Sequence, residues 1–286
     1  MPKKKSIIDF HDMKKEKEKV AWITAYDFPI ARFAEDAGVD MILVGDSLGM
    51  VVYGYDGTVS VTMEECIIHC KAVRRGAPYT FIVGDMPFGS YQKSDYDAVE
   101  NAIRFIKEAN VDAIKLEGGV RVASRIKAIS DAGIVVMGHI GLTPQSSGAL
   151  GGFKAQGRTA ESAEALIKDA LAVQDAGAKF LLVEAIPPEL AKAITRIFNI
   201  PVYGIGAGVD TDGQILICGD MLGYFEAFTP KFVKKYADVA QVITDAIKNY
   251  ISDVKNCSFP TPEHTYSILP EEKVKFDEML NRYLKY

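Results

Sequence analysis

Cysteine, histidine and tryptophan are scarce in this sequence of 286 residues, which has four cysteines, four histidines and one tryptophan. The cysteines lack the spacing of a disulfide framework, so a small disulfide-stapled fold is excluded and we expect free thiols in a reducing compartment. Long apolar runs are also missing. The longest runs, such as Ile134 to Met137 and Phe180 to Val183, are far shorter than the roughly 20 residues of a membrane helix.

The sequence has no excess of positive charge. Lysine and arginine number 33 against 38 aspartates and glutamates, which leaves a net charge of -5. This balance argues against a broad binding surface for nucleic acid or anionic membranes. Lys3, Lys4 and Lys5 are followed by only Ile7 and Ile8 before the first acidic residue, so the apolar part of a signal peptide is absent. We expect a cytoplasmic protein that binds neither nucleic acid nor membrane.

The composition is that of a globular chain with a large core, since 48% of the residues are hydrophobic and 25% are charged. Short apolar runs recur along the chain, each followed by a stretch with helical periodicity, and this alternation predicts βα units. The runs are rich in Val, Ile and Leu without strict alternation, as in strands buried on both faces. We expect eight strands, at 20–26, 41–46, 81–86, 113–118, 134–140, 180–185, 201–206 and 214–218.

Eight βα units predict a single-domain α/β protein with a (βα)8 TIM barrel. A doubly wound open sheet is the alternative, although such sheets more often have five or six strands. We expect the barrel within residues 1–266, after a short basic leader. Apolar residues from Phe232 to Tyr250 predict a long amphipathic helix that completes the outer ring, and residues 267–286 form a charged helical tail.

Polar residues lie at the carboxyl ends of five predicted strands, where a parallel barrel has its active site. They are Asp46 with Ser47, Asp85, Lys115 with Glu117, His139 and Glu184. Several carboxylates buried in one place require a cation, and oxygen ligands favour Mg²⁺ or Mn²⁺ over zinc. Each residue alone has a structural alternative: a helix cap or surface ion pair for either aspartate, a core imidazole for His139, and an ion pair for Lys115.

Three weaker motifs lie elsewhere. Residues 204–208, Gly-Ile-Gly-Ala-Gly, lack the spacing of a dinucleotide fingerprint and predict close backbone approach at the barrel mouth. The glycine-rich segment 148–158 is either a lid or part of a cofactor pocket, or an ordinary mobile loop. Cys66 and Cys70 flank His69 on a predicted helix, and core packing is a better interpretation than a metal site.

The sequence resembles the ketopantoate hydroxymethyltransferase family, the folate-dependent enzymes of pantothenate biosynthesis, over roughly residues 18–266. The segments that carry the resemblance are Thr24-Ala-Tyr-Asp27, Val44-Gly-Asp-Ser-Leu-Gly-Met50, Val73-Arg-Arg-Gly-Ala-Pro78, Ile114-Lys-Leu-Glu-Gly-Gly119, Gly138-His-Ile-Gly-Leu-Thr-Pro-Gln145, Gly151-Gly-Phe-Lys-Ala-Gln-Gly157, Gly204-Ile-Gly-Ala-Gly208, Asp212-Gly-Gln214 and Pro262-Glu-His264. The resemblance implies a TIM barrel, bound Mg²⁺ and a homodecamer. It also implies transfer of a hydroxymethyl group from methylenetetrahydrofolate to α-ketoisovalerate (3-methyl-2-oxobutanoate), which yields ketopantoate.

The resemblance also implies roles for individual residues. Asp46 and Asp85 would bind Mg²⁺ and help to hold the substrate, and Glu117 would reach the metal directly or through water. Ser47, Lys115 and His139 would bind the keto acid. Glu184, between apolar neighbours, would accept the proton that the substrate loses. The sequence does not locate the folate pocket.

Two other functions remain open at this point. The first is a Mg²⁺-dependent enzyme like phosphoenolpyruvate mutase or isocitrate lyase, which would also stabilise the enolate of a 2-oxo acid. Such enzymes often place a catalytic cysteine over the site, whereas Cys218 lies on a predicted strand and Cys257 near the C-terminal tail. The second is a non-catalytic barrel that binds a small acid or serves as a scaffold.

Overall fold

The computed structural model of the chain describes residues 4–284. Residues 1–3 of the expected leader and residues 285–286 of the expected tail lie outside the described residues. The chain forms two compact units, one that ends at Ala237 and one that begins at Asp238. Within the described residues, no helix is both long and apolar enough to cross a membrane.

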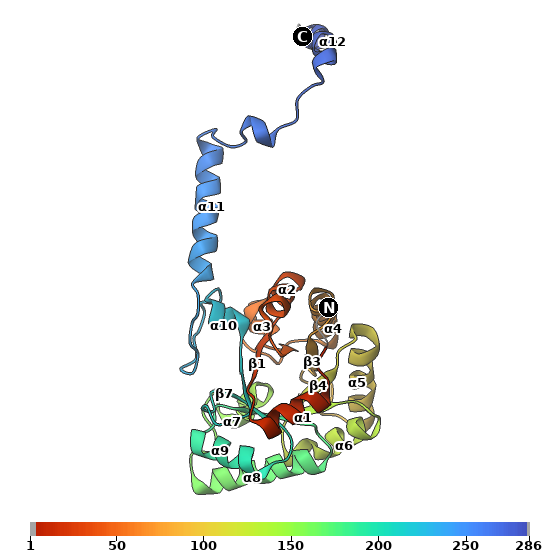
Figure 1. Ribbon diagram of the computed structural model, residues 1–286, viewed down its shortest axis with the longest axis vertical. Coiled ribbons are helices and arrows are strands. Elements are labelled where there is room, and N and C mark those ends of the chain that lie inside the picture. The colour runs from red at the N-terminus through yellow and green to blue at the C-terminus, as the bar shows by residue number, and fades with distance from the viewer. Residues whose placement is uncertain (1–3, 285–286) are drawn as a thin grey trace. The chain divides into compact units, whose positions relative to one another are not determined.

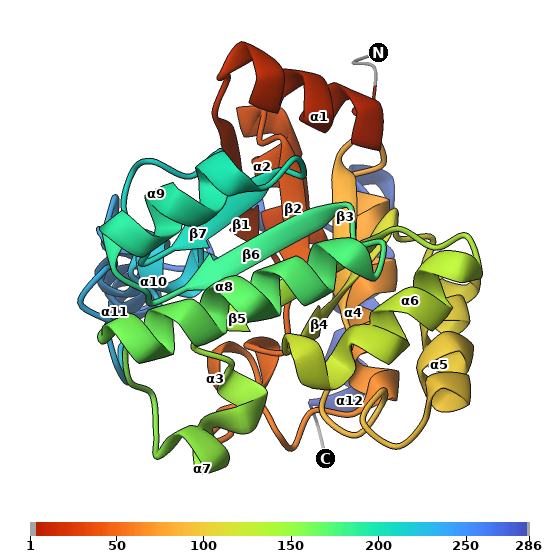
Figure 2. The same cartoon turned by 90° about the horizontal axis from the view of Figure 1, so that it is seen from below.

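The first unit is a closed barrel of eight parallel strands in sequence order, with β8 paired to β1 (Figure 2). The strands are β1 (Val20–Thr24), β2 (Met41–Val44), β3 (Phe81–Asp85), β4 (Ala113–Glu117), β5 (Val136–Gly141), β6 (Phe180–Glu184), β7 (Val202–Ile205) and β8 (Gly213–Leu216). The predicted TIM barrel is therefore confirmed, and the open sheet is excluded. Each observed strand overlaps its predicted segment, and no end differs by more than two residues.

Helices surround the strands, as Figure 2 shows for α2, α4, α5, α6, α8 and α9. The helices of this unit are α1 (Ile7–Glu16), α2 (Phe28–Ala37), α3 (Leu48–Val51), α4 (Met63–Gly76), α5 (Asp95–Ala109), α6 (Ala123–Asp131), α7 (Ser147–Leu150), α8 (Ala160–Asp175), α9 (Pro188–Ile197) and α10 (Cys218–Leu222), with 3-10 turns η1 (Val120–Val122) and η2 (Pro144–Ser146). Thr62 and Glu65 form a capping box at the start of α4, which satisfies backbone N–H groups that the helix leaves free.

The strands separate two apolar layers. In β4, Ile114 and Leu116 join the layer between sheet and helices, whereas Ala113 joins the layer inside the barrel. This alternation sends Lys115 and Glu117 to the inside as well, because successive side chains of a strand point to opposite faces. The interior is apolar at the amino ends of the strands and charged at their carboxyl ends.

Helix α1 covers the amino ends of the strands, where the sequence predicted only a basic leader (Figure 2). Its Phe10 is fully buried and meets Phe81 and Phe180 edge to face, with ring centroids 5.1 and 5.7 Å apart. Because Phe81 and Phe180 are the first residues of β3 and β6, Phe10 seals this end of the barrel. The opposite end, where the strands have their carboxyl termini, holds the cavity.

The second unit contains α11 (Val239–Lys255), η3 (Pro262–His264), η4 (Pro270–Glu272) and α12 (Lys273–Tyr283), labelled in part in Figure 1. The helix predicted from Phe232 begins only at Val239. The residues before Val239 form a loop. Their backbone hydrogen bonds do not follow the α-helical pattern, since the Val233 N–H donates to Pro230 O and the Tyr236 N–H donates to Met221 O. The helix expected to complete the outer ring is thus assigned to the second unit.

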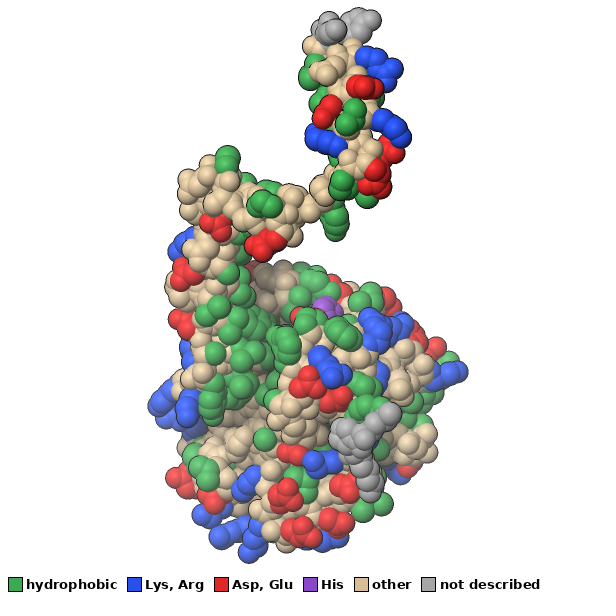
Figure 3. Space-filling view, turned by 45° about the horizontal axis from the view of Figure 1, so that its top comes forward, with side chains coloured by type: hydrophobic (Ala, Val, Ile, Leu, Met, Phe, Trp, Pro, Cys, Tyr) green, Lys and Arg blue, Asp and Glu red, His purple; other side chains and the backbone are tan. Residues whose placement is uncertain are grey.

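The helix predicted near the C-terminus is confirmed as η4 and α12. The division of the chain into a catalytic domain over 1–266 and a tail over 267–286 stays a prediction. On the face shown in Figure 3, basic and acidic side chains are interspersed over the surface of the barrel unit.

Candidate active site

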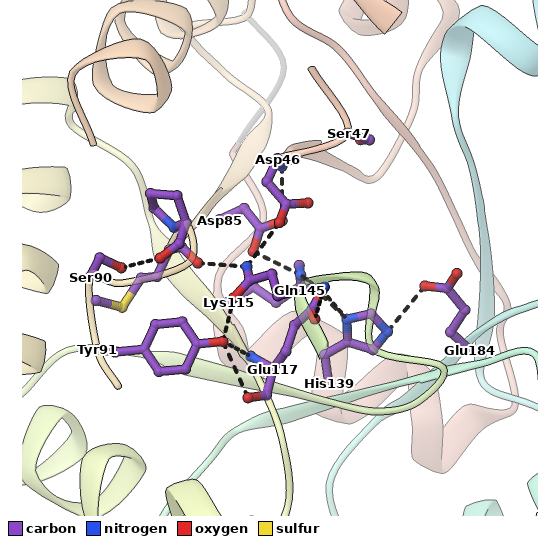
Figure 4. Close-up of polar contacts among 12 residues, drawn as sticks. Asp46, Ser47, Asp85, Ser90, Tyr91, Lys115, Glu117, His139, Gln145 and Glu184 are labelled. Carbon is purple, nitrogen blue, oxygen red and sulfur yellow. Dashed lines mark hydrogen bonds and ion pairs between the residues drawn. The ribbon is translucent and has the colours of Figure 1, made fainter. Parts of the chain in front are cut away.

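A cavity of about 400 Å³ opens at the carboxyl ends of the barrel strands. All seven residues that the sequence placed at this mouth line it: Asp46, Ser47, Asp85, Lys115, Glu117, His139 and Glu184. The structure therefore brings together side chains from five strand ends that are as much as 138 positions apart in the sequence, from Asp46 to Glu184. Figure 4 shows them converging.

The register of the strands explains why these side chains meet. Asp85 of β3 lies beside Lys115 of β4, and Glu117 of β4 lies beside His139 of β5. Because neighbouring strands are less than 5 Å apart, paired inward residues are within reach of one another. The parallel barrel thus converts strand-end residues into one connected cluster.

Lys115 is at the centre of this cluster. Its Nζ lies 2.7 Å from Asp85 Oδ1, 3.6 Å from Glu117 Oε1 and 3.3 Å from His139 Nδ1. Burial by itself would lower the pKa of Lys115, but the carboxylates of Asp85, Glu117 and Asp46 raise it above its ordinary value. The side chain is therefore a buried ammonium that compensates one of three carboxylates.

Asp46 and Asp85 are adjacent, since the Asp46 backbone N–H donates to Asp85 Oδ2 over 3.0 Å. Burial raises the pKa of Asp46 well above its ordinary value, and the charges of Asp85 and Glu117 raise it further. Burial likewise raises the pKa of Asp85, against the attraction of Lys115. Each shift has the same main origin, which is the removal of the carboxylate from water.

These oxygen atoms suit a hard divalent cation. Over residues 4–284, no three acidic, histidine or cysteine side chains form a group that could hold a metal by themselves. Asp46 and Asp85 would thus supply one or two carboxylates, with water and substrate oxygens completing the set, which is the way Mg²⁺ is commonly bound. The buried carboxylate oxygens of Asp46 and Asp85 fit such an ion.

His139 lies between two glutamates. Its Nδ1 is 3.4 Å from Glu117 Oε1, and its Nε2 is 3.1 Å from Glu184 Oε2 (Figure 4). Burial and the Lys115 ammonium would lower the pKa of His139, but the contacts with Glu117 and Glu184 raise it to about 9. The imidazole links Glu184 to the cluster, so the alternative of an isolated core histidine does not apply.

Glu184 occupies the edge of the cluster. Its side chain is 14% exposed, whereas those of Asp85, Lys115, Glu117 and His139 are at most 3% exposed. It is the last residue of β6, and the next residue, Ala185, has a positive φ of 48° that is unusual for a residue with a Cβ. The chain therefore turns directly after Glu184. The carboxylate is held by its contact with His139 and is accessible from the cavity.

Ser47 borders the same end. Its Oγ lies 2.8 Å from the Tyr26 hydroxyl, which accepts a hydrogen bond from Thr24 Oγ1 over 2.9 Å. Burial raises the pKa of Tyr26 well above its ordinary value, so the phenol stays protonated. Ser47 is thereby held next to Asp46 at the cavity wall.

Gln145 is a site residue that the sequence analysis did not single out, although it ends a quoted motif. Its Nε2 donates to Asp46 Oδ2 over 2.8 Å, and its backbone N–H donates to Glu117 Oε2 over 3.0 Å. Its Oε1 accepts from the Tyr91 hydroxyl over 2.6 Å. Gly141 begins the turn that delivers it, with a φ of 94° and space for no Cβ, since one would lie 2.3 Å from Glu184 O.

The other end of the cavity is mainly apolar and comes from loops and α10. Phe153 and Lys154 of the glycine-rich segment line it, which favours the interpretation of that segment as part of a pocket. Phe225, Phe228 and Asp220 line it too, and the sequence predicted none of these three as site residues. No strand pattern or motif with a chemical meaning pointed to them.

The remaining sequence motifs have structural roles. A Cβ on Gly206 would lie 2.6 Å from the Phe232 ring, which confirms the close approach predicted for that glycine segment. Cys66 and Cys70 are buried on α4, as core packing predicts. All four cysteines are free thiols.

Comparisons with known proteins give a consistent result. A sequence profile described as ketopantoate hydroxymethyltransferase matches residues 4–262. A 3-methyl-2-oxobutanoate hydroxymethyltransferase of Alkaliphilus metalliredigens is 66% identical over 283 residues, which are 99% of this chain and 100% of that protein. One of Geobacillus kaustophilus is 52% identical and covers 94% of this chain and 97% of its own.

Solved structures share the fold at low identity. Phosphoenolpyruvate phosphomutase from Streptomyces platensis subsp. rosaceus has a TM-score of 0.60 at 14% identity and covers 99% of both chains. A 2,3-dimethylmalate lyase of the PEP mutase/isocitrate lyase superfamily has a TM-score of 0.55 at 16% identity, with 96% of this chain and 98% of that chain covered. These structures establish a shared barrel.

Proposed function

The chain belongs to the ketopantoate hydroxymethyltransferase family, and from this premise we propose that its barrel mouth transfers a one-carbon unit from methylenetetrahydrofolate to 3-methyl-2-oxobutanoate. The observation that carries the proposal is the buried pair Asp46 and Asp85 beside Lys115, in a cavity that Glu184 also borders. The product is ketopantoate, a precursor of pantothenate and coenzyme A.

Asp46 and Asp85 are the metal ligands in this proposal, and the metal is Mg²⁺. When bound, the ion would neutralise the two carboxylates and act as a Lewis acid toward the ketone and carboxylate oxygens of the substrate. Glu117 is occupied by Lys115, His139 and the Gln145 N–H, so it would reach the ion through water.

The keto acid is bound by charge and hydrogen bonds. The Lys115 ammonium attracts the substrate carboxylate and stabilises the negative charge that develops on the ketone oxygen as the enolate forms. Ser47 offers a hydroxyl at the wall, and His139 offers an imidazole between the two glutamates. The residues that bind the substrate are thus fixed before it arrives, which reduces the reorganisation that the reaction requires.

Glu184 is the base. A carboxylate that removes the proton next to the ketone must border the substrate and stay outside the metal ligands, and Glu184 satisfies both conditions. His139 Nε2 lies 3.1 Å from Glu184 Oε2 and orients the carboxylate. The imidazole also balances the change in charge on Glu184 when the proton is transferred. The enolate carbon then forms a bond to the one-carbon unit, whose C–N bonds to the folate break. A water molecule supplies the hydroxyl oxygen of the product and the protons that tetrahydrofolate takes up as it leaves.

The superfamily alternative shares the barrel and the use of an enolate but not the family match. Barrel likeness at 14–16% identity supports the fold alone, whereas relatives at 52–66% identity support the hydroxymethyltransferase. The non-catalytic alternative would leave five charged residues, linked by ion pairs in the cavity, without a role.

Incubation of the protein with Mg²⁺, 3-methyl-2-oxobutanoate and methylenetetrahydrofolate tests the proposal. We expect ketopantoate, detected by mass spectrometry, and no product when either the metal or the folate is omitted. No product in the complete mixture, with Mg²⁺ shown to be bound, would refute it. Conversion of the 2-oxo acid without folate, to a product that lacks the added carbon, would favour the superfamily alternative.

The metal assignment has its own test. Asp46→Ala should weaken Mg²⁺ binding by about 100-fold in calorimetry, since removing one carboxylate of a two-carboxylate site removes a main source of affinity. Asp27→Ala, which removes an exposed helix-capping carboxylate of α2, is the matched control. Equal Mg²⁺ affinity of the Asp46 variant and the native protein would exclude Asp46 as a ligand.

The resemblance also supports a homodecamer in the cytoplasm, and sedimentation of the full chain would measure the subunit number. A species of any size other than ten subunits would contradict this part of the proposal.

A further inference from the structure

Asp220 is a buried carboxylate for which the proposed reaction gives no role. It lies on α10, is 4% exposed, and lines the same cavity as Lys115 and Glu184. Over residues 4–284, no hydrogen-bond donor or cation contacts its carboxylate, and Lys235 attracts it only from a distance. A carboxylate held out of bulk water without a partner is costly, so its position at a cavity wall points to a ligand.

The surroundings of Asp220 define what that ligand must be. Phe225, Phe228, Met50 and Val51 line the cavity with it, so a flat apolar body would find contact on several sides. Phe228 is 60% exposed in the free protein and thus has unused apolar surface. The ligand should combine a planar ring with hydrogen-bond donors along one edge.

The cavity has room for such a ligand beside the keto acid. Its volume of about 400 Å³ is within the range of sites that hold drug-sized ligands, and a five-carbon keto acid is smaller than such ligands. The second substrate must approach that end, because its methylene group reacts with the enolate there. The apolar end with Asp220 is the part of the same cavity that remains.

We propose that Asp220 binds the pterin ring of the folate co-substrate through the adjacent amino group and ring N–H of its pyrimidine edge. Two parallel N–H donors match the two oxygens of a carboxylate, and such charge-assisted bonds are stronger and more directional than neutral ones. Phe225 and Phe228 supply contact for the faces of the ring. This inference rests on the proposed function, because it assigns the folate end of that same site.

The test separates folate binding from keto-acid chemistry. Asp220→Asn keeps the shape but replaces one acceptor oxygen by a donor, so it should raise both the KM for methylenetetrahydrofolate and the Kd for tetrahydrofolate by roughly 10- to 100-fold. Exchange of the C3 proton of 3-methyl-2-oxobutanoate in D₂O, measured without folate, should stay within about twofold, since it uses only the charged end. Glu226→Gln, an exposed carboxylate in the following loop, is the matched control.

The outcomes are distinguishable. Unchanged tetrahydrofolate affinity in Asp220→Asn overturns the inference and leaves the proposed function intact. Loss of both exchange and folate binding in this variant overturns it as well, because Asp220 would then support the whole site. Failure of the native protein to exchange the proton or to bind tetrahydrofolate would instead refute the proposed function. Phe228→Ala provides a second variant, and a selective rise in the tetrahydrofolate Kd is expected there too.

Discussion

The two ends of the cavity are built in opposite ways. At the charged end, Asp85, Lys115, Glu117 and His139 come from adjacent strands and contact one another directly. At the apolar end, Asp220 comes from a short helix after β8 and has no hydrogen-bonded partner within the described part of the chain. In our proposal the charged end lacks only the metal cation and the anionic keto acid. At the apolar end, the Asp220 carboxylate is a hydrogen-bond acceptor without a donor among residues 4–284.

This difference indicates how the work is divided. Strands in a barrel are rigid and in fixed register, which suits a reaction that needs a base, an ammonium and two metal ligands at exact positions. Loops and short helices vary more in conformation, which suits the admission of a large second substrate. If both proposals hold, chemistry and co-substrate recognition belong to different structural elements of one cavity.

Glu184→Gln should have the largest effect, a loss of proton transfer at the charged end. The amide cannot accept the substrate proton, so C3 proton exchange should fall by about 10²- to 10⁴-fold in a deuterium-exchange assay. Mg²⁺ binding and tetrahydrofolate binding should be retained, which would locate the loss in proton transfer. Exchange at the native rate would assign the base to another residue.

Gln145→Ala should have a smaller effect, on the Mg²⁺ affinity of the charged end. The side-chain amide occupies Asp46 Oδ2, so its removal frees the carboxylate to rotate away from its ligand position. We expect Mg²⁺ affinity to fall by roughly 10-fold in calorimetry, in line with losses of supporting hydrogen bonds at other metal sites.

The same calorimetric experiment has a matched control, a glutamine far from the cavity in the sequence. Gln241→Ala, on the exposed surface of α11, should leave Mg²⁺ affinity unchanged. Equal affinities of the Gln145 and Gln241 variants would show that the Asp46 carboxylate needs no support from Gln145.

Asp220→Asn should produce the smallest change and in the opposite direction, a gain in stability. Burial raises the pKa of Asp220 from 3.8 to about 6, so between these values the folded state binds more protons and stability falls as pH rises. Above pH 6 the native protein carries the full penalty, which the amide avoids. The melting temperature of the metal-free variant should exceed that of the native protein by a few degrees at pH 7.5.

The gain should vanish near pH 4, because the aspartate is then protonated in the folded state. Scanning calorimetry at both pH values measures it. A lower melting temperature of Asp220→Asn at pH 7.5 would mean that the carboxylate supports the fold. In that case Asp220 would not be a residue that lowers stability for the sake of function.

Much of the charged end could be predicted because it obeys strand rules. Lys115 and Glu117 are two residues apart on one strand, and this spacing alone predicts that both lie on the same face of it. Gln145 escaped prediction because it reaches the site through a turn after β5, and a turn does not reveal which way a side chain points. Helix α1 was missed for a related reason, since Phe10 packs against Phe81 and Phe180 from distant strands.

The sequence by itself determined the number of βα units, the strand-end residues and the family, because hydrophobic periodicity and short motifs are local properties of the chain. The tertiary structure alone decided that Gln145 supports Asp46 and that Asp220 shares a cavity with Glu184. It also ended the barrel unit at Ala237. Such relations depend on barrel closure and on loop paths, which bring together residues whose separation in the sequence carries no signal of contact.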